Sequence, residues 1–306
     1  MSAHNQLRSH RFTRKKFDPI MSVDQESISV LFRKLGRELS KLASKPQPKN
    51  VHQFRTTTRR VEAVVEELVP QKDHSLRKLM KQLGKLRKRA GRVRDMDVLI
   101  SNLRNLKVSE EPGRKSEVLR SLAEMRSRRE EKLIDGLDKQ KVRNIQKRIK
   151  RAAASLTLRD GDLAGLATCM FSDLARANAN LNADVLHQYR IRGKRIRYIA
   201  EVAGDTAEAQ RIVSELKRMQ DAIGEWHDWL TLSEKAERLA TDGRPSALLA
   251  ALKNITRAKY RDAIQVVSET KNTLLPRSID SSKAPVRAGV GRKPSTPAAV
   301  ASVAVA

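Results

Sequence analysis

The chain has 306 residues, and its 63 Lys and Arg outnumber 35 Asp and Glu, which gives a formal net charge of +28. So much like charge favours a polyanionic partner, because self-repulsion costs a compact chain free energy. The single cysteine, Cys169, excludes an intrachain disulfide and an all-cysteine zinc site. The sequence contains no run of 18 uninterrupted apolar residues, so we expect no helix that spans a membrane.

Apolar residues recur at helical spacing along most of the chain, and Ala, Leu, Lys, Arg and Glu dominate its composition, which predicts an all-α protein. Short loops between helices with one apolar face each are typical of antiparallel bundles, so we expect two four-helix bundles. In chain order the expected helices are residues 27–43, 51–68, 74–106, 115–137, 139–156, 163–181, 186–204, 207–240 and 246–270.

Changes in composition divide the chain further. Residues 1–23 are polar and basic without an apolar run, so we expect a flexible arm and not a secretory signal. Residues 24–157 and 158–271 form the two helical halves. Residues 272–306 are rich in Ala, Pro, Ser, Val and basic residues, which predicts a disordered basic tail.

Two blocks of the sequence occur twice, which indicates an internal duplication. VHQFRTTTRRVEAVVEEL returns as LHQYRIRGKRIRYIAEVAG, and His52 matches His187 at an offset of 135 residues (187 − 52). LGKLRKRAGRVRDMDVL returns as LKRMQDAIGEWHDWLTL, and Gly91 matches Gly224 at an offset of 133 residues (224 − 91). Because both order and spacing are kept, we infer a duplicated helical unit.

The duplicated histidine helix carries a row of cations along one face. Positions 0, 3, 7 and 10 from the histidine fall along one stripe of a helix. We expect the two rows to form two halves of one anion site, and protonation of the histidines near a pKa of about 6.5 to strengthen anion binding as the pH falls. The rows are His52, Arg55 and Arg59, after which Glu62 interrupts, and His187, Arg190, Lys194 and Arg197.

The pattern H-x-x-R-x-x-x-[RK]-R, the following R-D-x-D-V or G-x-x-H-D block, and the second copy of both resemble the CHAD family, the conserved-histidine α-helical domain. The resemblance covers about residues 27–270. It implies two four-helix bundles related by a pseudo-two-fold axis, which bind inorganic polyphosphate without catalysis in a basic groove between them, and it implies an association with polyphosphate granules. No E-x-E-x-K motif is present, so the triphosphatase activity of some relatives is not expected. The binding residues that the resemblance implies are His52, Arg55, Arg59, Arg60, Arg87, Arg94, His187, Arg190, Lys194, Arg195, Arg197 and His227.

Other charged residues beside these rows have two interpretations each. One further basic stripe is either a ligand contact or a solvated face; it consists of Lys81, Lys85, Lys88 and Arg92. Three acidic residues are expected to hold Arg or His side chains in position, with metal binding as the alternative: Asp95, Asp97 and Asp228. No tight ligand spacing supports metal, so we expect neither a metal nor a cofactor.

Two other functions stay open. Sequence-independent nucleic-acid binding fits the charge, but aromatic residues are only 3% and do not alternate with the basic positions. We expect Trp226 and Trp229 in the core, with base stacking as the alternative. An enzyme acting on phosphate esters would need a metal and a positioned base or nucleophile, and no phosphate-cradling Gly-rich loop is present. We expect a cytoplasmic protein without membrane insertion, and the sequence predicts no oligomeric state.

Overall fold

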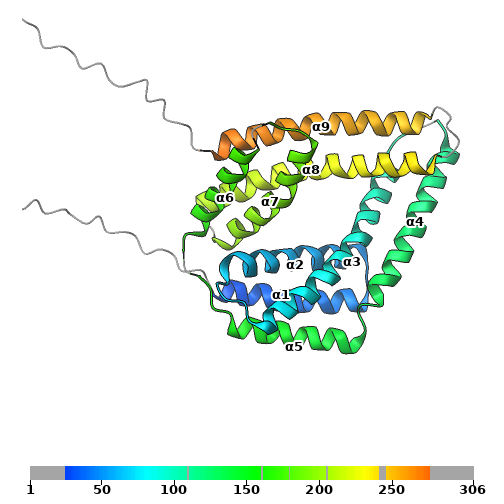
Figure 1. Ribbon diagram of the computed structural model, residues 1–306. Coiled ribbons are helices and arrows are strands. Elements are labelled where there is room, and N and C mark those ends of the chain that lie inside the picture. The colour runs from blue at the N-terminus through cyan, green and yellow to red at the C-terminus, as the bar shows by residue number, and fades with distance from the viewer. Residues whose placement is uncertain are drawn as a thin grey trace, which may run out of the picture. The chain divides into compact units, whose positions relative to one another are not determined.

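The computed structural model describes residues 25–108, 110–159, 161–178, 180–204, 206–240 and 246–275. Within them lie nine α-helices and no strand, so the predicted all-α class is confirmed, and none of the helices is long and apolar enough to cross a membrane. The helices are α1 (Gln25–Ser44), α2 (Pro48–Leu68), α3 (His74–Asn105), α4 (Pro112–Ile134), α5 (Lys139–Ser155), α6 (Leu163–Ala177), α7 (Ala183–Val202), α8 (Ala207–Leu239) and α9 (Ala247–Leu274) (Figure 1).

Short polar side chains determine where six of these helices begin. A side-chain oxygen just before each helix accepts a hydrogen bond from a backbone N–H three residues later, which satisfies a donor that the helix itself leaves unpaired. The capping residues are Asp73, Asp138, Asp162, Asn182, Thr206 and Ser246. Helices α2 and α4 begin instead with proline, whose missing N–H costs nothing in the first turn.

The helices pack as two bundles of four. Helices α1, α2, α3 and α5 form the first bundle, and α6, α7, α8 and α9 form the second (Figure 1). The first half of the chain therefore contains five helices among its described residues, as the periodicity predicts, but only four of them form its bundle. The additional helix, α4, packs on the distal end of α3, where Val118 and Leu122 join a cluster with Leu232 of α8 and Leu252 of α9.

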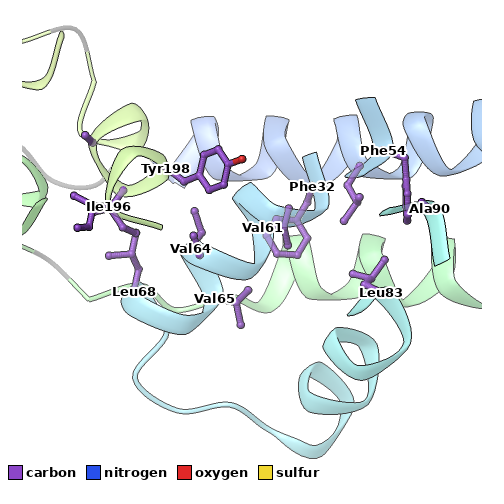
Figure 2. Close-up of a cluster of buried hydrophobic side chains, with 14 of the residues drawn as sticks. Phe32, Phe54, Val61, Val64, Val65, Leu68, Leu83, Ala90, Ile196 and Tyr198 are labelled. Carbon is purple, nitrogen blue, oxygen red and sulfur yellow. The ribbon is translucent and has the colours of Figure 1, made fainter. Parts of the chain in front are cut away.

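The two bundles meet where α2 crosses α7. Val64 and Leu68 of α2 and Ile196 and Tyr198 of α7 are buried there in the main core (Figure 2). Burial of aliphatic and aromatic side chains stabilises a contact by about 1.5–3 kcal/mol for each large side chain. The crossing therefore holds the polar faces of α2 and α7 in a defined relation.

The ends of the chain lie mostly outside the described residues. The expected arm, residues 1–23, and the tail beyond Leu275 cannot be compared with the structure. Helix α9 continues to Leu274, past the predicted start of the tail at residue 272. The described helices group as one compact unit. The division of the helical part at residue 157 stays a prediction, although no described helix crosses it.

Candidate anion-binding site

A cavity of about 650 Å³ lies at the crossing of α2 and α7, and α3 contributes to its wall. Two carboxylates, Glu62 and Glu66, also line it, beside the ring of Tyr198. Its basic lining residues come from all three helices and from the loop before α3: Arg59, Lys72, Arg77, Arg87, Arg190, Lys194 and Arg195. The predicted rows of α2 and α7 are thus brought together at Arg59, Arg190 and Lys194.

Five of these cations have no carboxylate within 4 Å among the described residues; Arg77 is exposed and Lys72 donates to a backbone oxygen, which leaves three half-buried cations without a partner. Among the described residues no carboxylate lies within 4 Å of Arg59, Arg190 or Lys194, and the Nε–H of Arg190 is buried without a hydrogen-bond partner. Buried polar groups are almost always paired, and an unpaired buried charge is costly. A cluster of half-buried cations that form no ion pair is therefore suited to an anionic ligand.

Burial and mutual repulsion change the proton affinity of these groups. Burial, the largest cause, and the charge of Arg55 together lower the pKa of Arg59 to about 10. Burial also lowers the pKa of Arg190, although Asp228 partly opposes this effect. The largest change is at Lys194, where burial and the charges of Arg190, Arg59 and Arg55 lower the pKa to about 7. The arginines remain charged at neutral pH, whereas the Lys194 amine is divided between its two forms.

Arg55 lies next to this group but carries a weak partner. Its guanidinium is 4.0 Å from the carboxylate of Asp95 on α3, and burial together with the charge of Arg190 lowers its pKa. In the duplicated register Asp95 matches Asp228, which acts in the same way on Arg190 and Lys194. The two aspartates are therefore placed beside the cations that they were expected to support.

Two predicted ligands, Arg60 and Arg195, instead join the bundles. Arg60 of α2 forms an ion pair with Glu201 of α7 (2.7 Å), and Arg195 of α7 forms ion pairs with Glu67 and with Glu66 (3.6 Å) of α2. The contacts are reciprocal, because Arg60 matches Arg195 and Glu66 matches Glu201 in the repeat. A two-fold relation between the halves would produce this pattern. The duplication itself stays a prediction.

Two more predicted ligands are held inside their own bundles. Arg87 of α3 pairs with Glu62 of α2 (2.7 Å), whereas Arg197 of α7 bonds Gln220 of α8 (2.9 Å) and pairs with Glu201 (3.0 Å). The positions correspond: Glu62 matches Arg197, and Arg87 matches Gln220. Glu62, which interrupts the first cationic row, therefore pairs with Arg87. At the position where the second row has Arg197, the first row has a cation from α3 instead.

The two repeat histidines lie away from the cavity, each near the residue expected on its neighbouring helix. His52 is close to Arg94, whose charge lowers its pKa together with burial, the larger cause, and Arg55. His187 stacks on His227 at 6.3 Å between ring centroids, and His227 lies 3.9 Å from Asp228. His52 and His187 do not line the cavity, so the structure does not bring them together there.

The remaining predicted residues lie elsewhere. Lys88 is exposed on α3 and does not line the cavity. Asp97 of α3 pairs with Arg126 of α4 (2.7 Å), so it joins α3 to α4 and does not position a cation of the cavity. Trp226 is buried against Tyr260 and Trp229 packs on the distal cluster, which confirms their core role. Within the described part of the chain no three His, Cys, Asp or Glu side chains are arranged to hold a metal.

Comparison with known proteins shows the family and the fold of the chain. A family model of the CHAD domain matches residues 27–237, which is more than half of the chain. The chain belongs to the CHAD domain family. The CHAD domain from the plant Ricinus communis aligns with a TM-score of 0.62 and 15% identity, over 89% of this chain and 97% of that one. PptA from Streptomyces chartreusis aligns with a TM-score of 0.58 and 14% identity, over 81% and 98%. A comparison with curated proteins found no match.

The sequence did not identify the acidic residues that organise the site of this CHAD domain. Glu62, Glu67 and Glu201 determine which arginines are neutralised. The guanidinium carbons of Arg197 and Arg60 lie over the ring of Tyr198, at 5.0 Å and 5.9 Å from the ring centroid. The repeat contained one usable signal, because Glu66 and Glu201 occupy matched positions. A glutamate kept in both copies of a basic helix predicts a charge partner.

We expect Glu201→Gln to destabilise the protein by about 1–2 kcal/mol, because it leaves both Arg60 and Arg197 without their carboxylate partner. Urea unfolding at neutral pH measures this change. The control is Glu234→Gln, which removes an equal charge from an exposed pair with Arg238 and should cost less than about 0.5 kcal/mol. Equal effects of the two changes would contradict the joining role of Glu201.

Proposed function

We propose that this CHAD domain binds inorganic polyphosphate in the cavity at the α2–α7 crossing, without catalysis. The observation that carries the proposal is the cluster of Arg59, Arg190 and Lys194, which are half-buried without a carboxylate partner among the described residues. Polyphosphate has about one charge per phosphate and no bases, so its binder needs several donors held close together. Guanidinium groups offer paired N–H donors that match phosphate oxygens.

The backbone geometry also favours binding. The cations are carried by helices whose crossing is held by buried side chains and by the ion pairs of Arg60 and Arg195. Less entropy is lost when a ligand meets donors on a rigid support than when it must order a loop. The four salt-bridged arginines, Arg60, Arg87, Arg195 and Arg197, serve in this proposal to position the free cations rather than as the main ligands.

Nucleic acid is the alternative polyanion, and the aromatic residues argue against it. Tyr198 lines the cavity, but its ring is buried and lies beneath two guanidinium groups, so it is not free to stack on a base. Trp226 is in the core. Proteins that bind single strands usually combine a basic groove with exposed aromatic rings. The donors without the stacking surface fit a bare phosphate chain better.

A competition experiment tests the proposal. Labelled long-chain polyphosphate bound to the domain is displaced with unlabelled polyphosphate or with single- and double-stranded DNA, at equal phosphate concentration and physiological salt. We expect polyphosphate to displace the label at lower concentration than either DNA. More effective displacement by DNA would overturn the proposal. Release of orthophosphate from polyphosphate in the presence of magnesium would instead favour an enzyme.

We also propose a cytoplasmic location for the protein, and an association with polyphosphate granules as part of the same proposal.

We expect the affinity for polyphosphate to fall as the pH rises from about 7 to 9. Free Lys194 has a pKa of about 7, and bound phosphates raise that pKa, so complex formation takes up a proton above pH 7. Calorimetry at pH 8 in buffers of different ionisation enthalpy measures the uptake. Lys194→Arg, which stays charged, should abolish it. The His52→Ala/His187→Ala variant should retain it, because burial lowers the pKa of His52 below its usual value of about 6.5.

A further inference from the structure

Lys194 differs chemically from the other cations of the cavity. Its amine is half-buried on α7, and the charges that act on it most strongly are positive. Arg55 and Arg59 act on it from α2 and Arg190 from its own helix, whereas Asp228 from α8 opposes them. Glu62 and Glu66 of α2 also line the cavity. The charged groups of α6, Asp173 and Arg176, pair with each other at the surface at 3.7 Å.

These surroundings leave a large fraction of the amine neutral at physiological pH, because its pKa is lowered to about 7. A neutral amine has a free electron pair and is a nucleophile, whereas an ammonium is not. The neighbouring guanidiniums of Arg59 and Arg190 stay charged at the same pH and can hold phosphate oxygens. A nucleophile and a phosphate-binding group therefore line the same cavity.

We propose that Lys194 is a self-modifying site, acylated by small acyl phosphates whose phosphoryl group is held by Arg59 and Arg190. The nitrogen electron pair attacks the carbonyl carbon, an N–C bond forms, and the C–O bond to the phosphoryl group breaks with its electron pair. Phosphate leaves into the guanidinium pair and takes up the proton that the nitrogen loses. The products are an amide at Lys194 and inorganic phosphate, and no metal or redox partner is needed.

Acylation of Lys194 would also weaken anion binding in the cavity. The amide is uncharged, so one of the three unpaired cations is removed. The inference needs the cavity to accept only one phosphoryl group and does not require a polyphosphate chain. Proposed function and proposed modification can therefore fail separately.

The test treats the full chain with acetyl phosphate and follows acetylation of each lysine by mass spectrometry. Lys72 is the internal control, because it lines the same cavity but donates to the backbone oxygen of Glu66 at 3.3 Å. At pH 7.5 we expect Lys194 to react about tenfold faster than Lys72, since a lower pKa supplies far more free amine at a modest cost in nucleophilicity. The rate at Lys194 should reach half its maximum near pH 7.

Two comparisons separate the parts of the proposal. The succinimidyl ester of acetic acid has no phosphate, so the preference for Lys194 should be smaller with it, and Arg59→Gln should slow acetyl phosphate more than the ester. A rate at Lys194 no greater than at Lys72, a half-maximal rate only near pH 10, or equal selectivity with both reagents would overturn the proposal. Added polyphosphate should protect Lys194; acetylation that persists unchanged would contradict polyphosphate binding while leaving the modification site intact.

Discussion

Replacing Arg59 and Arg190 together by glutamine is expected to weaken polyphosphate binding by about 100-fold or more near 0.15 M salt. Each guanidinium donates charge-assisted hydrogen bonds, and the loss of one such interaction costs about 1.5–3 kcal/mol. Two losses therefore remove about 3 kcal/mol or more, which corresponds to a factor of 100 or more in Kd. Both residues line the cavity without a carboxylate partner, so no new buried acid is left unpaired.

The matched control changes the net charge equally at positions away from the cavity. Arg128 and Arg176 are exposed and pair with Glu124 and Asp173 on their own helices. Their double replacement by glutamine should alter Kd by only a fewfold, because surface charge acts at long range through screened attraction. Calorimetry on both double variants makes the comparison. If the two pairs weaken binding equally, net charge and not the cavity determines affinity.

The Arg59→Gln/Arg190→Gln variant also tests whether repulsion among the cavity cations lowers the stability of the folded protein. Arg59, Arg190 and Lys194 repel one another, and removing two of these charges relieves that repulsion. We therefore expect the Tm of the Arg59→Gln/Arg190→Gln variant to equal or exceed that of the wild type. Weaker binding then reflects lost contacts and not unfolding.

Val64→Asp is expected to destabilise the protein by about 3 kcal/mol or more and to abolish binding. Val64 is 0% exposed in the core where α2 meets α7, so the new carboxylate would be buried without a partner or protonated (Figure 2). The control is Val30→Asp on α1, where the valine is 44% exposed and the change should cost less than about 0.5 kcal/mol. Urea unfolding measures both.

This comparison also tests whether the crossing supports the site. Arg59 lies on the same helix as Val64, and Lys194 and Arg190 lie on the helix that crosses it. A variant that stays folded with the crossing disturbed would separate the two halves of the cavity. Retention of wild-type affinity by Val64→Asp would show that one bundle binds the ligand alone.

Local sequence features were sufficient for the helices. The apolar periodicity of residues 74–106 and 207–240 predicts the two long helices, and Asp73 and Thr206 cap them as short polar residues usually do. Periodicity predicts the helix over residues 115–137 but does not predict that α4 lies outside the first bundle, because periodicity shows that one face is buried but not against which partner. Its apolar positions pack on the distal cluster instead.

The repeat predicted which basic residues correspond to each other, but it did not predict which remain free. Arg59 and Arg60 are neighbours on one helix and have the same chemistry. Arg60 is neutralised by Glu201 of the second bundle, whereas Arg59 lines the cavity without an ion pair. The 3.6-residue period of a helix places a side chain on a face and says nothing about the charges that a crossing helix brings to that face.

The amino-acid sequence by itself determined the helical class, the helix limits within a few residues, and the excess of cations on α2 and α7. Only the tertiary structure decided that Glu62, Glu67 and Glu201 neutralise some of those cations, that Arg59, Arg190 and Lys194 remain unpaired, and that the Lys194 amine titrates near neutrality. The physical reason is that periodicity and capping act over a few residues of one chain segment, whereas desolvation and ion pairing depend on groups distant in sequence that packing brings within a few ångströms.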